Sequence, residues 1–316
     1  MAKAKSKEVI HDPNFIPPSV TIPISPVTTS YYTPIPSKIQ ASPEEPVILG
    51  VDEAGRGPVL GPMVYGIAYC LKEYSNELKK FGFADSKTLT DSKRRSLLQE
   101  MCNEEEGHEL FEHVGWAVTS LTARDISSGM LKPKKFGNYN LNEQAHDATI
   151  GLIKGVLQRG VNLKEVYVDT VGPPATYQKK LEGIFPGIQI TVAKKADATY
   201  PIVSTASVVA KVTRDISLEK SKEADHGDEG GWGSGYPSDP NTAKWLNGNV
   251  DPLFGWDLNI RFSWQTTKDS LTRNKALNLV WEDDLPIIVE KNYGNVESML
   301  DSSNKEKTLD CTWFVR

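Results

Sequence analysis

The pattern that most directly suggests chemistry is a pair of adjacent carboxylates, Asp52 and Glu53, at the end of an apolar run. Residues 47–51 are mostly β-branched and lead into turn residues, which predicts a short buried strand. Two acids at the exit of a buried strand are costly unless a cation compensates their charge. Carboxylates without His or Cys neighbours suit a divalent metal ion, although a strand end with two solvated acids fits this segment equally well.

A Gly55-Arg56-Gly57 triplet and Pro58 follow the two acids directly. Glycine lets backbone N–H and C=O groups approach a bound molecule closely. Taken alone, the triplet indicates no more than an ordinary tight turn. Its meaning therefore depends on the motifs elsewhere in the chain.

Six further segments belong to the same pattern as residues 52–66, and they occur in the order Asp85–Lys87, Asn140–Asp147, Val166–Gly172, Lys194–Pro201, Ala210–Asp215 and Gly233–Pro237. Together they resemble type 2 ribonuclease H, and they look most like the catalytic subunit of the eukaryotic three-subunit enzyme. The resemblance covers roughly residues 47 to 283. Each string is weak evidence by itself, whereas six in order are highly specific.

The resemblance implies four acids that are both catalytic and metal-binding, namely Asp52, Glu53, Asp169 and Asp197. If the strands that end at Asp52 and Asp169 are parallel neighbours, both side chains lie at the sheet edge where α/β proteins build their sites. Two Mg²⁺ ions about 4 Å apart would then clamp the attacking water and the leaving oxygen. Hard oxygen ligands favour Mg²⁺, or Mn²⁺ as a substitute, over Zn²⁺.

The implied reaction is hydrolysis of the RNA strand of RNA–DNA hybrids, and cleavage 5′ to single ribonucleotides embedded in duplex DNA. It leaves a 3′-hydroxyl and a 5′-phosphate. Selection for ribose requires a detector of the 2′-hydroxyl. The resemblance assigns this detection to Gly55, Arg56 and Gly57, and it places Tyr236 against the deoxyribose that follows.

Four polar residues are candidates for phosphate contact, by resemblance and by residue type: Lys87, Asn140, Lys211 and Arg214. For Lys211 a solvated helix face fits equally well. His146 lies within a matched motif, and we expect it to be structural rather than a general acid.

The charge balance limits how the chain binds nucleic acid. The chain has a net charge of −5, so it lacks the excess of basic residues that is typical of a protein that coats nucleic acid tightly. Local lysine clusters are the alternative footprint, and each also fits a solvated surface. The balance is compatible with an enzyme that grips a duplex weakly and turns over.

Cysteine usage and hydropathy indicate the compartment. The chain has three cysteines, an odd number without metal-ligand spacing, which fits a reducing environment. No run of about 18 apolar residues and no apolar signal segment occur, so we expect no membrane span and no secretion. We expect an intracellular, nuclear protein, although the lysines of residues 2–7 are more typical of an ordinary charged terminus than of an import signal.

The chain divides into four predicted regions. Residues 1–46 hold nine of the 20 prolines and are expected to form a disordered tail. Residues 47–222 are expected to form the catalytic core, and residues 223–284 a helical extension packed on it. Residues 285–316 form a C-terminal tail, a candidate for docking to the two accessory subunits that the resemblance implies.

The core alternates between strand and helix patterns. Five strands are expected, over residues 47–51, 62–70, 114–119, 166–168 and 189–192. This order predicts an α/β class with a mixed five-stranded sheet and helices on both faces, plus the C-terminal helical extension. The resemblance implies that the sheet is ribonuclease H-like. Two alternatives remain: another two-metal nuclease of the same fold, and a non-catalytic scaffold that binds nucleic acid or partner subunits.

Overall fold

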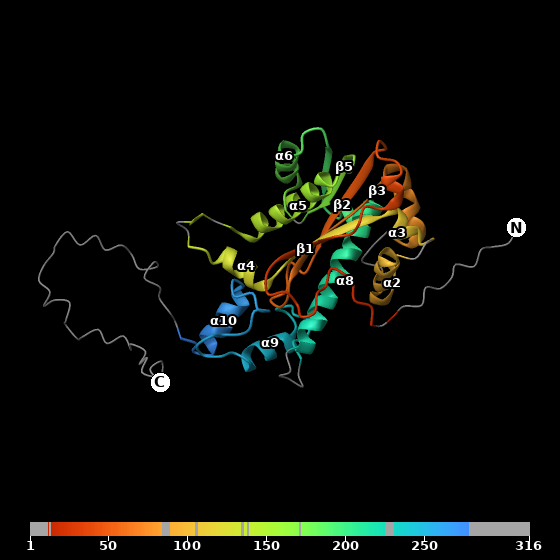
Figure 1. Cartoon of the computed structure of the whole chain (residues 1–316). Helices are drawn as coiled ribbons and strands as arrows, with labels where there is room; N and C mark the ends of the chain where they lie inside the picture. The colour runs from red at the N-terminus through yellow and green to blue at the C-terminus, as the bar shows by residue number, and fades with distance from the viewer. Residues whose placement is uncertain are drawn as a thin grey trace, which may run out of the picture. The chain divides into compact units, whose positions relative to one another are not determined.

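The computed structural model describes residue 12 and residues 14–83, 89–104, 107–133, 136–137, 139–170, 172–224 and 231–277. Its centre is a six-stranded sheet with the order β1-β4-β3-β2-β5-β6 (Figure 1). The strands are β1 (Thr29–Tyr32), β2 (Val47–Ala54), β3 (Met63–Leu71), β4 (Gly115–Leu121), β5 (Leu163–Asp169) and β6 (Gln189–Ala193). The first four in chain order pair antiparallel, whereas β5 is parallel to both β2 and β6. The predicted mixed α/β sheet is confirmed, with one strand more than expected.

The additional strand, β1, lies in the segment predicted to be disordered, so that prediction is wrong for residues 14–46. Here β1 pairs antiparallel with β4, from Thr29 opposite Ser120 to Tyr32 opposite Ala117. The segment has no core of its own, but it inserts Val20 and Ile39 into the core of the domain. Contacts with elements distant in the sequence therefore offset the entropy of ordering this proline-rich chain.

This arrangement predicts that the N-terminal segment contributes to stability. Ile39 is 4% exposed, and we expect Ile39→Ala to lower the free energy of unfolding by about 2–4 kcal/mol because it leaves a cavity. Ile22→Ala is the matched control, since Ile22 is 63% exposed and should cost less than about 0.5 kcal/mol. Urea denaturation measures both. Equal, negligible effects would mean that the segment does not pack on the domain.

The described helices are α1 (Ser37–Gln40), α2 (Asp91–Cys102), α3 (Glu109–His113), α4 (Ala123–Met130), α5 (Leu141–Gln158), α6 (Pro174–Ile184), α7 (Ala196–Thr199), α8 (Pro201–Ala224), α9 (Pro240–Gly248) and α10 (Gln265–Arg273), with a 3₁₀ helix at Lys72–Phe81. The longest, α8, crosses one face of the sheet (Figure 1). Its backbone touches the strands directly, since a Cβ on Gly50 would lie 2.4 Å from the Ile202 oxygen, and a Cβ on Gly66 2.8 Å from the Ala206 oxygen.

The opposite face of the sheet is covered by α5 and α6. Side chains alternate between the two faces along a strand, so Tyr65 points away from the α8 side that Gly66 faces. Tyr65 shares a cavity lining with Ala145 of α5 and Tyr177 of α6. Helices therefore cover both faces of the sheet, as predicted.

The C-terminal part of the described chain packs around a second, smaller apolar cluster: Val59, Leu60, Leu218, Trp232, Trp245, Leu246 and Ile260. These residues come from the loop after β2, the end of α8 and the segment that contains α9. The extension is thus joined to the loop that follows the Gly-Arg-Gly triplet. Among the described helices, none is both long enough and apolar enough to cross a membrane.

Candidate active site

The four predicted acids line one pocket of about 460 Å³ together with the Gly55-Arg56-Gly57 turn. The strands explain this convergence. Val51 of β2 pairs with Val168 of the parallel strand β5, so the next residues, Asp52 and Asp169, lie side by side where the pairing of these two strands ends. β5 in turn pairs with β6, which leads into α7, where Asp197 lies.

A left-handed turn holds two of these acids in place. Lys195 has a φ of 58°, a conformation that costs a residue with a Cβ of order 1 kcal/mol or more. The turn directs the Ala196 N–H to Asp169 Oδ1 at 2.9 Å. It also begins α7, in which the Asp197 side chain is buried.

Burial and mutual repulsion of the carboxylates dominate the electrostatics of these acids. Burial raises the pKa of Asp52 well above its usual range and the adjacent Glu53 raises it further, while a hydrogen bond with Ser207 opposes the shift. Burial also raises the pKa of Glu53 to about 7, against the lowering effect of Arg56. Asp169 raises both pKa values. A bound cation would relieve this repulsion.

A pH dependence of stability follows. A carboxyl whose pKa is higher in the folded protein favours folding at low pH, and this contribution is lost as the pH rises through the folded pKa. For Glu53 the window runs from 4.5 to about 7. We expect metal-free protein in a chelator to lose on the order of 2–3 kcal/mol of unfolding free energy from this group across that window.

Urea denaturation at about pH 5 and about pH 8 tests this expectation. Glu53→Gln should reduce the pH slope, because it removes the titrating group. Glu182→Gln, which changes an exposed carboxyl on α6, should leave the slope intact. An unchanged slope in Glu53→Gln would contradict the electrostatic account.

The acids share a pocket without forming a ligand cluster. Within the part of the chain that the structure describes, no three His, Cys, Asp or Glu side chains are grouped so as to hold a metal ion. The donor chemistry nevertheless fits a hard divalent ion, because four carboxylates converge and two of them have raised pKa values. The roles of the four residues as metal ligands remain predictions.

An arginine that the sequence analysis missed fixes the Gly-Arg-Gly turn. Arg261 is fully buried, and its guanidinium donates to three carbonyl oxygens: Gly61 at 3.1 Å, Arg56 at 3.0 Å and Gly55 at 2.6 Å. Burial, and to a lesser extent the nearby Arg214, lower its pKa to about 9. No local pattern marks this residue, since its partners lie about 200 positions earlier in the chain.

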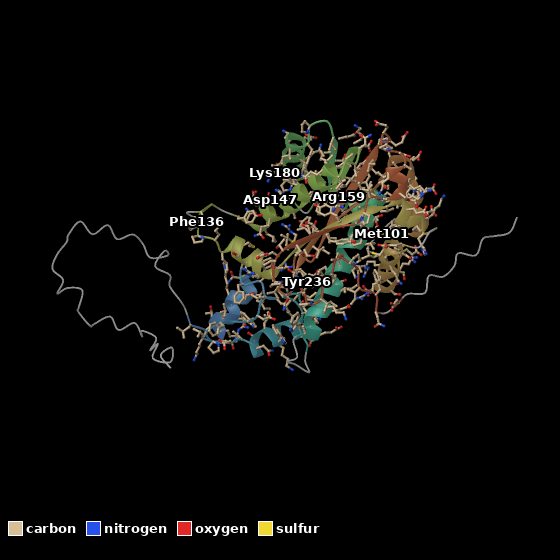
Figure 2. The ribbon with its side chains drawn as sticks, in the orientation of Figure 1. Met101, Phe136, Asp147, Arg159, Lys180 and Tyr236 are labelled. Atoms are coloured by element: carbon tan, nitrogen blue, oxygen red, sulfur yellow. The ribbon has the colours of Figure 1, made fainter. Side chains whose placement is uncertain are left out.

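Tyr236, which Figure 2 labels, lines the same pocket as the turn. A Cβ on Gly57 would lie 3.3 Å from its ring, so the glycine permits this approach. The preceding carbonyl, Gly235 O, accepts from Val59 N–H at 2.8 Å. Trp264 Nε1 donates to Gly57 O at 3.1 Å. The extension thus carries both the predicted sugar-contacting tyrosine and the groups that hold the turn.

The four residues predicted to contact phosphate differ in where the structure places them. Lys211 and Arg214, both on α8, line the pocket. Asn140 caps α5 through its side-chain oxygen, which accepts from the backbone N–H groups of Asn142 and Glu143, and its predicted phosphate contact stays a prediction. Lys87 lies outside the described residues, so its predicted role stays a prediction.

A second cavity of about 290 Å³ adjoins the first between α5 and α6, and both are lined by Glu53, Arg56 and Asp169. In its wall the His146 ring stacks on Tyr177, with ring centroids 3.9 Å apart. Burial lowers the pKa of His146. Stacking and a lowered pKa favour the expected structural role over general acid catalysis.

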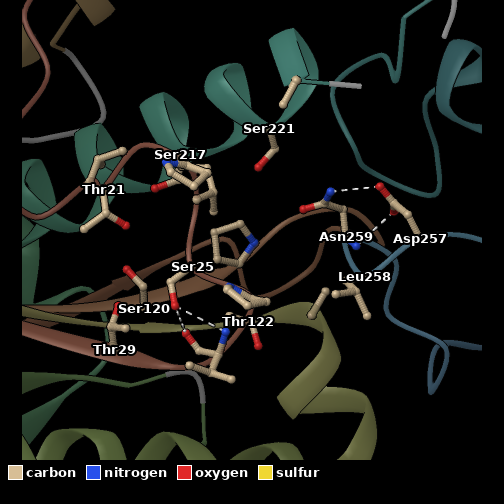
Figure 3. Close-up of a pocket in the computed structure, with 18 of the residues that line it drawn as sticks. Thr21, Ser25, Thr29, Ser120, Thr122, Ser217, Ser221, Asp257, Leu258 and Asn259 are labelled. Carbon is tan, nitrogen blue, oxygen red and sulfur yellow. Dashed lines mark hydrogen bonds between the residues drawn. The ribbon is translucent and has the colours of Figure 1, made fainter. Parts of the chain in front are cut away.

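A further cavity of about 310 Å³, shown in Figure 3, has none of the four acids in its lining. Prolines, hydroxyls and aliphatic side chains dominate its lining. Among the residues that line it, Asp257 is the one charged side chain, and its carboxylate accepts from Asn259 at 3.0 Å. This lining offers no chemistry for phosphodiester hydrolysis.

The sheet, the acid edge and the Gly-Arg-Gly turn define a nuclease of the ribonuclease H class, and the sequence comparisons agree. The sequence model of the ribonuclease HII family matches residues 49–267, and the chain belongs to this family. The A subunit of ribonuclease H2 from Neurospora crassa is 51% identical over 274 residues, which cover 85% of this chain and 84% of that protein. Its human counterpart is 46% identical over 253 residues, covering 79% and 80%. The predicted enzyme class, a ribonuclease H, is confirmed, and so is the resemblance to its catalytic subunit.

Solved structures share the fold. The ribonuclease H2 of Pyrococcus horikoshii superposes with a TM-score of 0.59 at 28% identity, covering 72% of this chain and 99% of that one. A ribonuclease HIII (Bst-RNase HIII) solved in complex with Mn²⁺ has a TM-score of 0.54 at 18% identity, covering 76% and 74%. At that identity the second similarity shows the common fold alone.

Proposed function

We propose that this ribonuclease H depends on divalent metal and cuts on the 5′ side of single ribonucleotides in duplex DNA as well as within RNA–DNA hybrids. The observation that carries the proposal is the convergence of four carboxylates, the Gly-Arg-Gly turn and Tyr236 on one pocket. A pocket with acids alone would fit any two-metal nuclease. The turn and the tyrosine add a surface for inspecting a sugar.

Asp52, Glu53, Asp169 and Asp197 would hold the metal, Mg²⁺ or Mn²⁺. When bound, a pair of such ions activates water and neutralises charge on the phosphate. The carboxylates supply oxygen donors without competing His or Cys ligands. The chain's own residues need supply no covalent nucleophile.

Sugar recognition is assigned to the turn. Gly55 has a φ of 78°, which glycine adopts without strain. Gly57, two residues further along the turn, is exposed and lies beside the ring of Tyr236. In this proposal the backbone of residues 55–57 reads the 2′-hydroxyl, and Tyr236, 44% exposed, stacks on the following deoxyribose. Arg56 reaches the start of α5, where its guanidinium donates to Asn142.

The test compares three duplexes in Mg²⁺: DNA with one embedded ribonucleotide, an RNA–DNA hybrid, and all-DNA. We expect cleavage of the DNA with one ribonucleotide, on the 5′ side of the ribose, and cleavage of the RNA–DNA hybrid. We expect no cleavage of the all-DNA duplex. Equal cutting of all-DNA, especially branched DNA, would favour another two-metal nuclease. Binding without any cutting would favour a scaffold.

The relatives are named as one lettered subunit of ribonuclease H2, which implies an enzyme of more than one kind of chain. We extend the proposal to two accessory subunits and to action in the nucleus. Copurification from the native cell nucleus, followed by the embedded-ribonucleotide assay, tests both. Recovery of the chain alone would contradict the heterotrimer.

A further inference from the structure

Arg94, on α2, lines the catalytic pocket although no motif of the sequence marks it. Its side chain is 11% exposed, so most of the guanidinium has left water. One nitrogen donates to Leu89 O, and another lies 3.6 Å from the half-exposed carboxylate of Asp91. Nε is buried and has no hydrogen-bond partner among the described residues.

Arg214, on α8, has the same character. The residue is 7% exposed, and Nη1 donates to Asp215 Oδ1 at 2.9 Å. Its Nε and Nη2 are buried without a partner in the described chain. The side chain packs against the turn, since a Cβ on Gly55 would lie 3.1 Å from Arg214 Cγ.

Two buried guanidinium groups with unused donors thus line the pocket that contains the acids. Leaving a buried donor unsatisfied costs about 1–3 kcal/mol, and more when the group is charged. A bound anion would satisfy these donors. The planar fork of arginine matches a phosphate with two parallel hydrogen bonds.

We propose that Arg94 and Arg214 together bind one backbone phosphate of the cut strand, next to the phosphate that is hydrolysed. The assignment rests on the proposed function, because it takes the ligand to be a nucleic-acid strand. Arg94 would then bind substrate, although it lies outside the sequence motifs that carry the resemblance. The competing explanation is that Arg94 only fastens the chain at Leu89.

The adjacent residue supplies a matched control. Arg95 is also on α2 and is 13% exposed, but it pairs with Asp91 and with Glu219 of α8 and does not line the pocket. Arg95→Gln removes the same charge from the same helix. Arg94→Lys keeps the charge but loses the fork.

The experiment measures binding of a duplex with one ribonucleotide to the uncleaving Asp52→Asn protein, between about 50 and 300 mM salt. Arg94→Gln should weaken binding about tenfold and reduce the slope of log K against log salt by about 0.9. Arg94→Lys should keep the slope while it weakens binding. Arg95→Gln should change neither quantity.

A phosphate scan identifies the ligand. Single neutral methylphosphonates are placed along the cut strand, and one position should weaken binding to the Asp52→Asn protein that keeps Arg94. A methylphosphonate at that position should not weaken binding further when the protein also carries Arg94→Gln. It should still weaken binding when the protein carries Arg95→Gln. Thermal unfolding shows whether each variant is folded. If Arg94→Gln does not fold, the phosphate scan is carried out with Arg94→Lys.

An unchanged salt slope in Arg94→Gln, with the methylphosphonate effect intact, would overturn the assignment and leave Arg94 a loop fastener. If the unsubstituted protein still cuts 5′ to the ribonucleotide in that case, the proposed function stands. If the unsubstituted protein neither binds nor cuts the duplex, the proposed function fails and this assignment fails with it.

Discussion

Replacing Asp52 by asparagine is expected to reduce cleavage of a ribonucleotide-containing duplex by about 10³-fold or more while duplex binding is retained. Asparagine has nearly the same shape, but it lacks the charge and the second oxygen that a divalent ion requires. Asp169→Asn should behave alike, because its side chain lines the same pocket beside Asp52. Single-turnover cleavage in Mg²⁺ and equilibrium binding without Mg²⁺ measure the two properties.

The same substitution has a second expected effect that separates chemistry from misfolding. Burial raises the pKa of Asp52 well above its usual range, so ionising it at neutral pH costs folding free energy in the absence of metal. Asp52→Asn should therefore raise the melting temperature of the metal-free protein. The control is Asp269→Asn on α10, an exposed acid that accepts from Gln265, which should leave both cleavage and stability unchanged. Turnover retained in Asp52→Asn would show that this acid is not needed.

Strands β2 to β6 were predictable from the sequence because their signals are local, whereas the set of four acids came from the resemblance. An apolar run that leads into turn residues marks β2 wherever its partners lie, and Asp52 and Asp169 directly follow such runs. What the sequence left open was whether the two strands are parallel neighbours. Pairing of β2 with β5 answers that point, since it places both acids at one sheet edge.

The N-terminal segment was not predictable for the opposite reason. Its prolines and sparse apolar residues are typical of disorder, because composition measures only what a segment can bury against itself. β1 forms by pairing with β4, about 90 positions further along the chain. Arg159 adds to this docking, since it donates to Thr33 O and lies 4.4 Å over the Tyr32 ring.

The supporting arginines were missed for a related reason. Arg261 and Arg94 have no informative neighbours in the sequence, and each acquires its role only through elements that folding brings to it. Burial of an arginine is the structural signal, because an arginine is rarely buried without partners. The sequence alone does not reveal which of the chain's arginines is buried.

Arg261→Gln is expected to produce the second large effect. The guanidinium satisfies the carbonyls of Gly55, Arg56 and Gly61 in a buried site, and glutamine offers fewer donors and a shorter reach. The orphaned carbonyls should lower the free energy of unfolding by about 3 kcal/mol or more. Arg261→Lys keeps the charge but not the fork, so we expect an intermediate loss.

The functional consequence follows from geometry rather than from charge. The carbonyls that Arg261 holds belong to the turn assigned to reading the 2′-hydroxyl, and a displacement of about 1 Å at a reacting centre costs on the order of 10²-fold in rate. We expect Arg261→Gln to lose about that factor on a single embedded ribonucleotide, measured below its melting temperature, and less on a continuous hybrid, where neighbouring riboses offer other registers. Arg273→Gln, an exposed arginine on α10 that donates to Asn247, should change neither rate. Equal losses on both substrates would mean that Arg261 supports the fold in general and not the sugar-reading turn.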